Sequence, residues 1–403
     1  MEDTMTYQLI IKGGRILSPG DNVDMIADVA IDDGKIVSIK PELGDDANRV
    51  LDVRGLLVTP GLLDLHTHVD FGMRTVGVNA RGVNPDLIGV RAGVPTIVDA
   101  GTTGPMNFGG FRNYVIEKAQ TRVLAFLHAG RGGITMEPDV RYEDDVNVDF
   151  FETAVANNRD IIVGVKMRLM GPGLQSLGAT IVELAKSAAR KVKLPLMVHC
   201  GDHYSKFDGA GEVTRAALRL FEKGDIIEHT YTPIPGGHLT DSGDISSELR
   251  DAVDRGVLVS VAGGGMHFSY RVAQTMLDAG IMPSFIATDL NSINHRQGCW
   301  SFTEVLSQFL ALGFPLKDVI ELATIKPALA VHKDDVLGRL TEGREADISI
   351  LDVVEGDWYY DDIEGNQIKG QQAIMPKATI RRGEVISVDW GPHPWGWLPA
   401  PIV

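Results

Sequence analysis

The sequence predicts an α/β protein made of a (β/α)8 TIM barrel and a small β-sandwich domain formed by the N- and C-terminal segments. Short apolar segments alternate with helical patterns through the middle of the chain, which indicates parallel βα units. Alternating strand patterns occur at both ends. The 223 residues from His66 to Asp289, divided over seven βα steps, give about 32 residues per step, which matches the repeat of such a barrel.

The first 57 residues are predicted to form strands. Ala27–Ile31 and Lys35–Ile39 alternate between apolar and polar residues, and Asp33-Gly34 separates them. An Asp-Gly pair between two alternating runs is a strong signal for a β-hairpin. Residues 1–57 are therefore the first part of the predicted sandwich domain.

The C-terminal segment, residues 335–403, returns to strand patterns. Ala346–Asp352 is a predicted strand, and Ala378–Val388 is predicted to contain two strands around Arg382-Gly383. From their order in the chain, we expect the two terminal segments to pair with each other and to complete the sandwich domain beside the barrel.

Residues 58–334 form the predicted barrel. Helical patterns such as Thr180–Ala189 lie between strands of buried type. In chain order the predicted strands are Leu62–His68, Pro95–Ala100, Arg122–His128, Ile161–Arg168, Leu194–Cys200, Ile226–Thr230, Val257–Gly263 and Ser284–Asp289.

Composition excludes several classes of function. The chain has 403 residues, a net charge of −16 and two cysteines. The negative charge argues against binding to nucleic acid or to an anionic membrane, and two cysteines are too few for a disulfide framework. No apolar run reaches the roughly 18 residues of a membrane span, and the first residues lack a signal-peptide pattern. We therefore expect a cytoplasmic protein, with a homo-oligomer allowed, whose partner is a small-molecule substrate.

Two histidines at the end of the first barrel strand indicate a metal site. His66 and His68 are separated by one residue, and side chains at positions i and i+2 of a strand point to the same face. Two imidazoles directed at one point are typical of a strand that holds a metal ion.

Four further polar residues lie at the ends of later strands. On the repeat of about 32 residues, Lys166 falls on the fourth strand, His199 on the fifth, His229 on the sixth and Asp289 on the eighth. In barrel enzymes the catalytic residues lie at the carboxyl ends of the strands. Together with the first two histidines, these residues form a suitable ligand set for two divalent metal ions.

Lys166 needs a separate explanation, because an ammonium group would be repelled by metal ions. Burial favours the neutral amine, which can react with CO2 to give an anionic carbamate. Such a carbamate can bridge two metal ions, and a water shared by the ions has its pKa lowered toward neutrality. The sequence thus predicts a metal-bridging hydroxide as the nucleophile.

These segments together resemble the amidohydrolase superfamily. The resemblance is carried by Pro60–His68, the strands of Lys166, His199 and His229, and Asp289, and it covers nearly the whole chain. Within the superfamily, the chain is similar to the carbamylated-lysine, binuclear zinc members such as dihydroorotases, hydantoinases and the bacterial deacetylase/D-aminoacylase-like group. The segments around Lys166, His199 and Asp289 look closest to the deacetylase-like group.

The resemblance implies how two zinc ions are held. The implied ligands are His66, His68 and Asp289 for the more buried ion, His199 and His229 for the second ion, and the carbamate of Lys166 for both. Asp289 would also accept a proton from the attacking water and deliver it to the leaving group. The second ion would polarise the scissile carbonyl.

Two more residues are candidate substrate contacts. Arg168 lies two residues after Lys166 and faces the same side of the strand, where its guanidinium could bind a substrate carboxylate. The alternative for Arg168 is a structural ion pair with Asp64 or Glu228. His267 follows the seventh strand at a position where a small residue is expected in the deacetylase-like group, and we expect it to line the opposite side of the site.

Three other histidines follow predicted strands, namely His128, His203 and His295. Each belongs to the catalytic rim if the barrel prediction holds. The sequence leaves open whether they contact substrate or are ordinary loop residues.

Three functions fit these observations. The first is metal-dependent hydrolysis of an amide or ester bond in a small acylated acid, such as an N-acyl amino acid or an acetylated hydroxy acid. The second is hydrolysis of a cyclic amide, of the dihydroorotase or hydantoinase type, or of a lactone at the same site. The third is a non-catalytic scaffold, which the complete set of candidate ligands disfavours.

Overall fold

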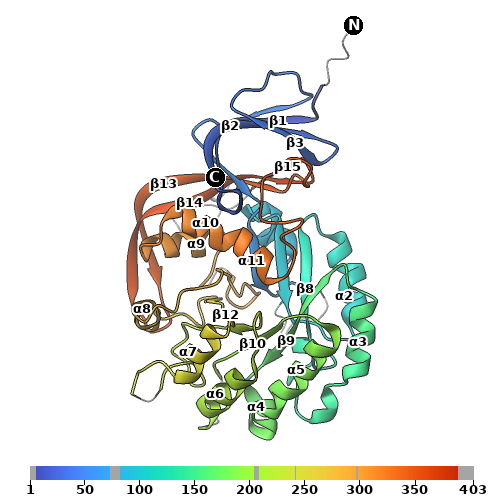
Figure 1. Cartoon of the computed structure of the whole chain (residues 1–403), viewed down its shortest axis with the longest axis vertical. Coiled ribbons are helices and arrows are strands. Elements are labelled where there is room, and N and C mark those ends of the chain that lie inside the picture. Colours follow the sequence, from blue (N-terminus) through green and yellow to red (C-terminus); the bar gives the residue numbers. More distant parts are fainter. Residues whose placement is uncertain (1–5, 73–81, 204–207, 241, 296–297, 389–403) are drawn as a thin grey trace.

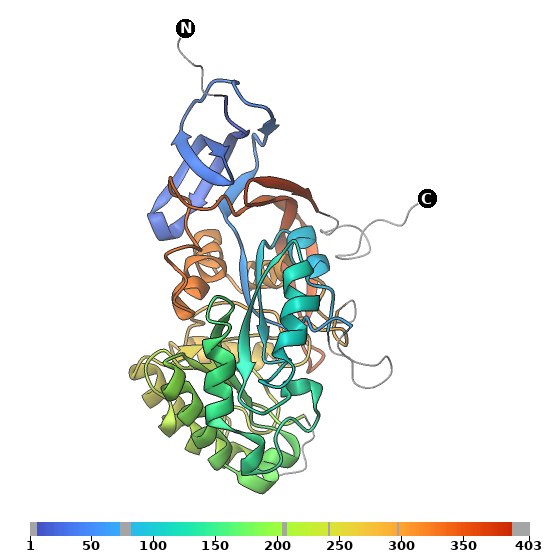
Figure 2. The ribbon, with the colours of Figure 1, turned by 90° about the vertical axis from the view of Figure 1, so that its right-hand side faces the viewer.

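The computed structural model describes residues 6–72, 82–203, 208–240, 242–295 and 298–388. They form a curled parallel sheet of seven strands and a separate sheet of eight strands (Figure 1). The eight-stranded sheet lies at one end of the molecule, and most of the helices pack around the parallel sheet (Figure 2). The predicted α/β class with parallel βα units is confirmed.

The parallel sheet contains counterparts of the first seven predicted strands. Its neighbouring strands follow one another in chain order, as repeated βα units require. The strands are β6 (Leu63–Thr67), β7 (Thr96–Ala100), β8 (Arg122–His128), β9 (Ile162–Arg168), β10 (Leu196–His199), β11 (Ile226–Glu228) and β12 (Leu258–Val259).

The predicted eighth strand, Ser284–Asp289, is not a strand in the structure. This segment makes single bridges instead, with Phe285 opposite Ser260 and Leu290 opposite Thr67. Ile286 N–H bonds to the carbonyl of Leu322 at 3.0 Å and Thr288 N–H to the carboxylate of Asp64 at 3.1 Å, so these groups do not extend a ladder to a neighbouring strand. Asp289, the last predicted residue, has a φ angle of 61°, in the left-handed region. The described hydrogen bonds therefore show seven strands in this sheet. The segment 284–290 contacts both edges of the sheet, near β12 and at β6.

The helices cover the outer face of the parallel sheet. Helix α5 (Thr180–Val192), predicted from the pattern of residues 180–189, buries Ile181, Ala185 and Ala188 at spacings of three and four residues. The other α-helices are α1 (Pro85–Ile88), α2 (Phe108–Tyr114), α3 (Val148–Ala156), α4 (Gly171–Leu177), α6 (Ala210–Leu220), α7 (Ser247–Asp254), α8 (Tyr270–Asp278), α9 (Phe302–Ala311), α10 (Leu316–Ala323) and α11 (Ile325–Ala330). Within the described ranges, none of the helices has the length and apolar character that a membrane crossing requires.

The two ends of the chain meet in the eight-stranded sheet. Strand β5 pairs with β1 on one side and with β13 on the other, so the expected pairing of the terminal segments is confirmed. The hydrogen bonds describe one sheet, and they do not divide it into the two layers of the expected sandwich. Its strands are β1 (Leu9–Ser18), β2 (Val23–Asp32), β3 (Lys35–Lys40), β4 (Val50–Asp52), β5 (Leu57–Pro60), β13 (Ile348–Asp361), β14 (Gln367–Arg381) and β15 (Glu384–Ser387).

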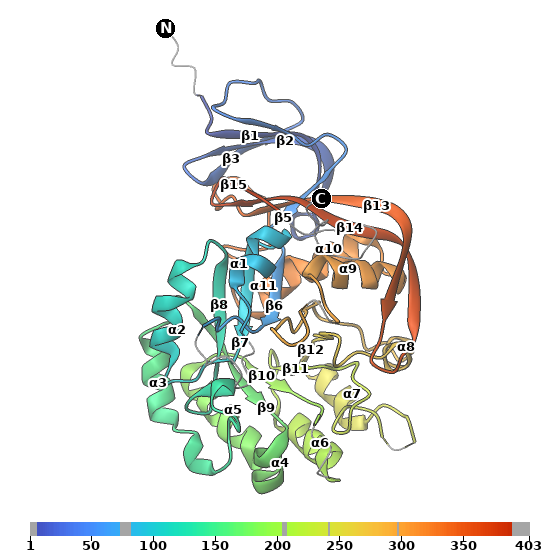
Figure 3. The same ribbon diagram turned by 180° about the vertical axis from the view of Figure 1, so that it is seen from behind.

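Strands β13 and β14 form a long hairpin that the sequence did not predict in full. Only Ala346–Asp352 and Ala378–Val388 had clear strand patterns. The structure extends the pairing to Asp361 and Gln367, so the far end of the hairpin lies beside α8 (Figure 3). The last predicted residues, 389–403, lie outside the described part of the chain.

A buried aspartate joins β6 to the segment that follows β12. Asp64 is 1% exposed, and its carboxylate accepts hydrogen bonds from the hydroxyl of Thr288 at 2.5 Å and from the backbone N–H of Thr288 at 3.1 Å. It also accepts the backbone N–H of His66 at 3.2 Å. Burial raises the pKa of Asp64 to about 7. This side chain therefore adds to the backbone bonds that join residues 288–290 to the end of β6.

We expect Asp64→Ala to lower the free energy of unfolding by roughly 3 kcal/mol, because three buried donors lose their acceptor. Urea unfolding followed by circular dichroism, at fixed metal content, measures this change. Asp254→Ala, at an exposed position of α7, is the control and should change stability by less than about 0.5 kcal/mol. Equal stabilities for the two variants would show that Asp64 does not join these segments.

Candidate metal centre

A cavity of about 180 Å³ lies at the carboxyl ends of the parallel strands. The predicted site residues that line it are His66, His68, Lys166, Arg168, His199, His267 and Asp289. His229 is buried beside them, with its ring 4.4 Å from that of His199. The fold thus brings all the predicted site residues together.

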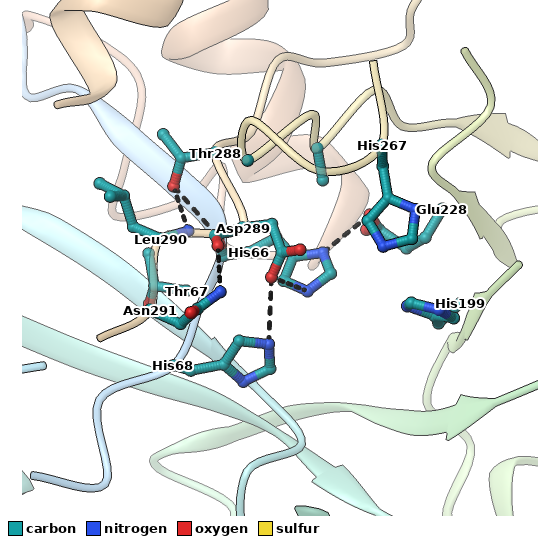
Figure 4. Close-up of polar contacts among 12 residues, drawn as sticks. His66, Thr67, His68, His199, Glu228, His267, Thr288, Asp289, Leu290 and Asn291 are labelled. Carbon is teal, nitrogen blue, oxygen red and sulfur yellow. Dashed lines mark hydrogen bonds and ion pairs between the residues drawn. The ribbon is translucent and has the colours of Figure 1, made fainter. Parts of the chain in front are cut away.

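His66 is held by a carboxylate from β11. Its Nδ1 lies 2.8 Å from Oε2 of Glu228, and both side chains are buried. A carboxylate can only accept, so Nδ1 carries the proton and Nε2 keeps its lone pair. That Nε2 lies 3.4 Å from Oδ1 of Asp289 (Figure 4).

His68 is held in the same way by a hydroxyl group. Its Nδ1 lies 2.8 Å from Oγ1 of Thr102, and this hydroxyl donates to Oδ2 of Asp99 at 2.7 Å. Because the hydroxyl proton is used for Asp99, Thr102 accepts from Nδ1 of His68. The Nε2 atom of His68 lies 3.2 Å from the same Oδ1 of Asp289.

Three atoms that can act as metal ligands therefore converge, namely Nε2 of His66, Nε2 of His68 and Oδ1 of Asp289. Burial lowers the pKa of His66 well below its usual value, which keeps this imidazole neutral. Two imidazole lone pairs facing a carboxylate oxygen repel one another unless a cation lies between them. Two ligands about 2.1 Å from a tetrahedral zinc ion are roughly 3.3 Å apart, close to the two separations found here. The residues fit a metal ion.

The backbone at Asp289 is strained and firmly held. Its φ angle of 61° is costly for a residue other than glycine, by about 1–3 kcal/mol. Its N–H donates to the carbonyl of His66 at 2.8 Å. Its own carbonyl accepts the side-chain amides of Asn291 at 2.9 Å and Asn294 at 2.6 Å. These bonds direct the carboxylate toward the two histidines.

A second group of imidazoles lies next to the first. His229 donates from Nδ1 to the carbonyl of Ala262 at 2.7 Å, which leaves the lone pair on Nε2. Among the described residues, this buried Nε2 has no hydrogen-bond partner. His199 donates from Nε2 to the carbonyl of Gly201 at 3.0 Å, so Nδ1 is its candidate donor atom. Nitrogens of His199, His229 and His267 lie within 4.8 Å of one another, close enough to surround an ion.

Lys166 lines the same cavity with an amine that the described residues leave without a hydrogen bond. The side chain is 1% exposed, and its Nζ is buried. Burial lowers the pKa of Lys166, although the carboxylates of Glu228 and Asp289 act in the opposite direction. A buried amine that tends toward neutrality is the form that reacts with CO2.

Arg168 is engaged by a residue that the sequence analysis did not identify. Its Nε donates to Oδ2 of Asp139 at 2.9 Å, and Nε2 of His128 lies 2.9 Å from the same oxygen. Burial alone would raise the pKa of the Asp139 carboxyl, but the charge of Arg168 and the bonds from His128 and Arg168 hold it well below its usual range. Arg168 thus forms a buried ion pair, the alternative to substrate binding, but its partner is Asp139 and not Asp64 or Glu228, whose carboxylates bind Thr288 and His66.

His267 lies against the second group of imidazoles. Its ring stacks on that of His229, with the centroids 3.9 Å apart and the planes 16° apart. Its Nε2 is 2.6 Å from Nε2 of His203, so this loop histidine also reaches the site. His295 is not among the described residues that line the cavity.

Several residues of the site were missed by the sequence analysis, above all Glu228, Thr102 and Asp139. In a regular strand Glu228 and His229 would point to opposite faces. His229 has a φ angle of 56°, however, and it leaves the strand after Glu228, so both side chains reach the site. An acidic residue directly before a candidate ligand was the only signal of this partner.

Comparisons with known proteins agree with this geometry. The sequence profile of the amidohydrolase family matches residues 57–386. A deacetylase of Agrobacterium fabrum is 30% identical over 361 residues, which cover 89% of this chain and 86% of the relative. This chain is also similar to two solved structures.

The first is a crystal structure of an adenine deaminase, with a TM-score of 0.85 and 27% identity, covering 94% of this chain and 100% of that one. The second is a crystal structure of a dihydroorotase, with a TM-score of 0.82 and 28% identity, covering 94% and 97%. The prediction of a metal-dependent hydrolase is confirmed, and the chain belongs to the amidohydrolase family.

Proposed function

We propose that this protein hydrolyses an amide or ester bond of a small acylated acid, with two divalent metal ions, expected to be zinc, at the candidate centre. The observation that carries the proposal is the convergence of His66 Nε2 and His68 Nε2 on Asp289 Oδ1, at 3.4 and 3.2 Å, three buried groups that are close enough together to hold a metal ion. The deacetylase relative supports the acyl substrate.

The residues present are sufficient to hold two ions. His66, His68 and Asp289 would bind one ion, and His199 and His229 would bind the other. A carbamate on Lys166 would bind both ions. When bound, such ions activate water and polarise a carbonyl group. The bonds that fix His66, His68 and His229 through Nδ1 keep the Nε2 lone pairs directed at the centre.

Asp289 is the group that moves the proton. Its carboxylate lies in the cavity, 7% exposed, and it would take a proton from the attacking water and return it to the leaving group. Arg168 would bind the substrate carboxylate, with Asp139 holding its Nε edge in place. His267 would contact the substrate from the loop after β12.

The fold of the proposed enzyme includes a complete barrel. We assign residues 58–334 to a (β/α)8 barrel in which segment 284–290 occupies the eighth position, because it bridges to Ser260 at one end and to Thr67 at the other. Residues 1–57 and 335–403 would form the companion domain.

A second candidate function is hydrolysis of a cyclic amide, which the likeness to a dihydroorotase structure favours. An assay of the metal-loaded protein on a substrate panel separates the two proposed functions. The panel contains N-acetyl amino acids, acetylated hydroxy acids, hydantoins, dihydroorotate and lactones. Turnover of the acylated acids is expected. Turnover confined to the cyclic amides would replace the first proposal with the second.

Replacement of Lys166 by alanine should remove metal and activity together, because the proposed bridging anion is lost. Elemental analysis of protein purified without chelator should give about two equivalents in the parent chain, the content of a two-metal site, and clearly less in Lys166→Ala. Short carboxylic acids added to the variant should restore part of both. A variant with full metal content and full activity would exclude the carbamate.

Replacement of Asp289 by asparagine should affect turnover more than folding. The amide keeps one oxygen for the metal but cannot take a proton at neutral pH, so we expect kcat to fall by about 10²–10⁴-fold. Steady-state kinetics and thermal unfolding, measured side by side, check this. If turnover stays near the parent value, another group in the cavity transfers the proton.

Replacement of Arg168 by lysine keeps a positive charge near Asp139 but loses the planar fork. We expect kcat/KM for acidic substrates to fall by at least about tenfold, while their neutral methyl esters change little. The comparison of acid and ester within one variant controls for changes in folding. Equal losses on both would show that Arg168 only supports the structure through Asp139.

A further inference from the structure

The far end of the β13–β14 hairpin contacts the chain directly after His267. We call Tyr360–Glu364 the hairpin tip. It lies against Phe268–Arg271, the segment that leads from the His267 loop into α8 (Figure 3). The terminal sheet therefore touches the loop that carries a candidate substrate contact.

Every residue of Phe268–Arg271 is hydrogen-bonded to the hairpin tip, through backbone and side chains. The bonds are Ile363 N–H to the Phe268 carbonyl (3.1 Å), Ser269 Oγ to the Glu364 carboxylate, Tyr270 N–H to Asp362 Oδ2 (2.9 Å), Tyr270 hydroxyl to the Tyr360 carbonyl (3.0 Å) and Arg271 Nη2 to Glu364 Oε1 (2.9 Å). Ser269 also caps α8 by accepting the N–H of Val272. The start of α8 is thus fixed to the terminal sheet.

The loop before His267 is held at its start by its own turn, where Met266 N–H and His267 N–H donate to the carbonyl of Gly263, and by Asn294, whose side-chain amide donates to the carbonyl of Gly264 at 2.8 Å. It contains Gly263, Gly264 and Gly265, and the last two have φ angles of 54° and 65°. Glycine gives the backbone this freedom and lowers its resistance to other conformations. Behind the loop lies a cavity of about 380 Å³, bounded by these glycines on one side and by Tyr359–Ile363 on the other. On the side of this cavity, the bonds of the hairpin tip hold the end of the loop.

His267 transmits this restraint to the candidate metal centre. Its N–H donates to the carbonyl of Gly263 at 2.8 Å, and its ring stacks on His229 and meets His203. A shift of the segment after His267 would move the ring relative to both. A displacement of about 1 Å in a group that positions substrate is enough to change catalysis strongly.

We propose that the hairpin tip positions His267, and that Glu364 and Asp362 are positioning residues through which the C-terminal segment sets substrate affinity. This inference rests on the proposed function, in which His267 contacts the substrate. Glu364 is the better residue to change, because Asp362 also accepts the N–H groups of Glu364 and Asn366 in the turn of the hairpin itself.

The test compares Glu364→Ala with Lys369→Ala. Lys369 forms a 2.8 Å ion pair with Asp357 on the same hairpin and makes no hydrogen bond to Phe268–Arg271 among those described, so its loss is a matched control. We expect Glu364→Ala to raise KM by about 3- to 10-fold with kcat within about twofold and metal content unchanged. Glu364→Gln, which still accepts from Ser269, should restore most of the affinity. Lys369→Ala should behave as the parent chain.

Amide hydrogen exchange over residues 263–268 gives a readout that needs no substrate. Exchange should be faster in Glu364→Ala than in Lys369→Ala. In a His267→Ala background, Glu364→Ala should have no further effect on KM, because both changes act through one side chain. Equal exchange in the two hairpin variants would overturn the proposal, as would faster exchange without a change in KM. If no substrate of the panel is turned over, the proposed function fails while the exchange result still decides the positioning.

Discussion

The hydrogen bonds between β6 and residues 288–290 determine the geometry of the whole candidate centre. Asp289 N–H bonds to the carbonyl of His66, and His68 N–H bonds to the carbonyl of Leu290, each at 2.8 Å. Asp64 adds the bond to the hydroxyl of Thr288. Two chain segments more than 200 residues apart are thereby joined at three successive points, so the carboxylate of Asp289 reaches both imidazoles.

The surroundings of the imidazoles explain why they face the centre as acceptors. Glu228, Thr102 and the carbonyl of Ala262 each accept the Nδ1–H of one ring. Burial lowers the pKa of His66 and of His229 well below the usual value, which keeps these two rings neutral. Outer partners of this kind fix the tautomer and orientation of metal-ligating histidines. The arrangement suits a cation, because two imidazole nitrogens and a carboxylate oxygen converge on one point.

The terminal sheet supports this centre at two separate places. Strand β5 leads directly into β6, and the buried hydroxyl of Ser349 on β13 bonds to Leu62 and to the carbonyl of Gly93 at the start of the parallel sheet. At the other end of the same hairpin, the hairpin tip holds the segment after His267. The eight-stranded sheet therefore restrains both β6, which leads to His66 and His68, and the loop that carries His267.

The sequence by itself determined which side chains share a face at the strand ends. His66 and His68, and likewise Lys166 and Arg168, follow the two-residue period of an extended backbone, which is a local property. That period, with the spacing of the strands, was enough to predict that these residues lie together; all of them line one cavity except His229, which is buried beside it. Their roles as ligands and substrate contacts remain proposals.

Only the tertiary structure decided the partners of these side chains. Arg168 bonds to Asp139, His66 bonds to Glu228, and Phe268–Arg271 bonds to the hairpin tip. Each of these contacts joins segments that are distant in the chain. The predicted eighth strand does not form because the N–H groups of Ile286 and Thr288 bond to Leu322 and to the Asp64 side chain. His229 reaches the site beside Glu228 because its own backbone is left-handed. Such conformations are imposed by bonds from other segments, which the local polarity pattern of a sequence does not encode.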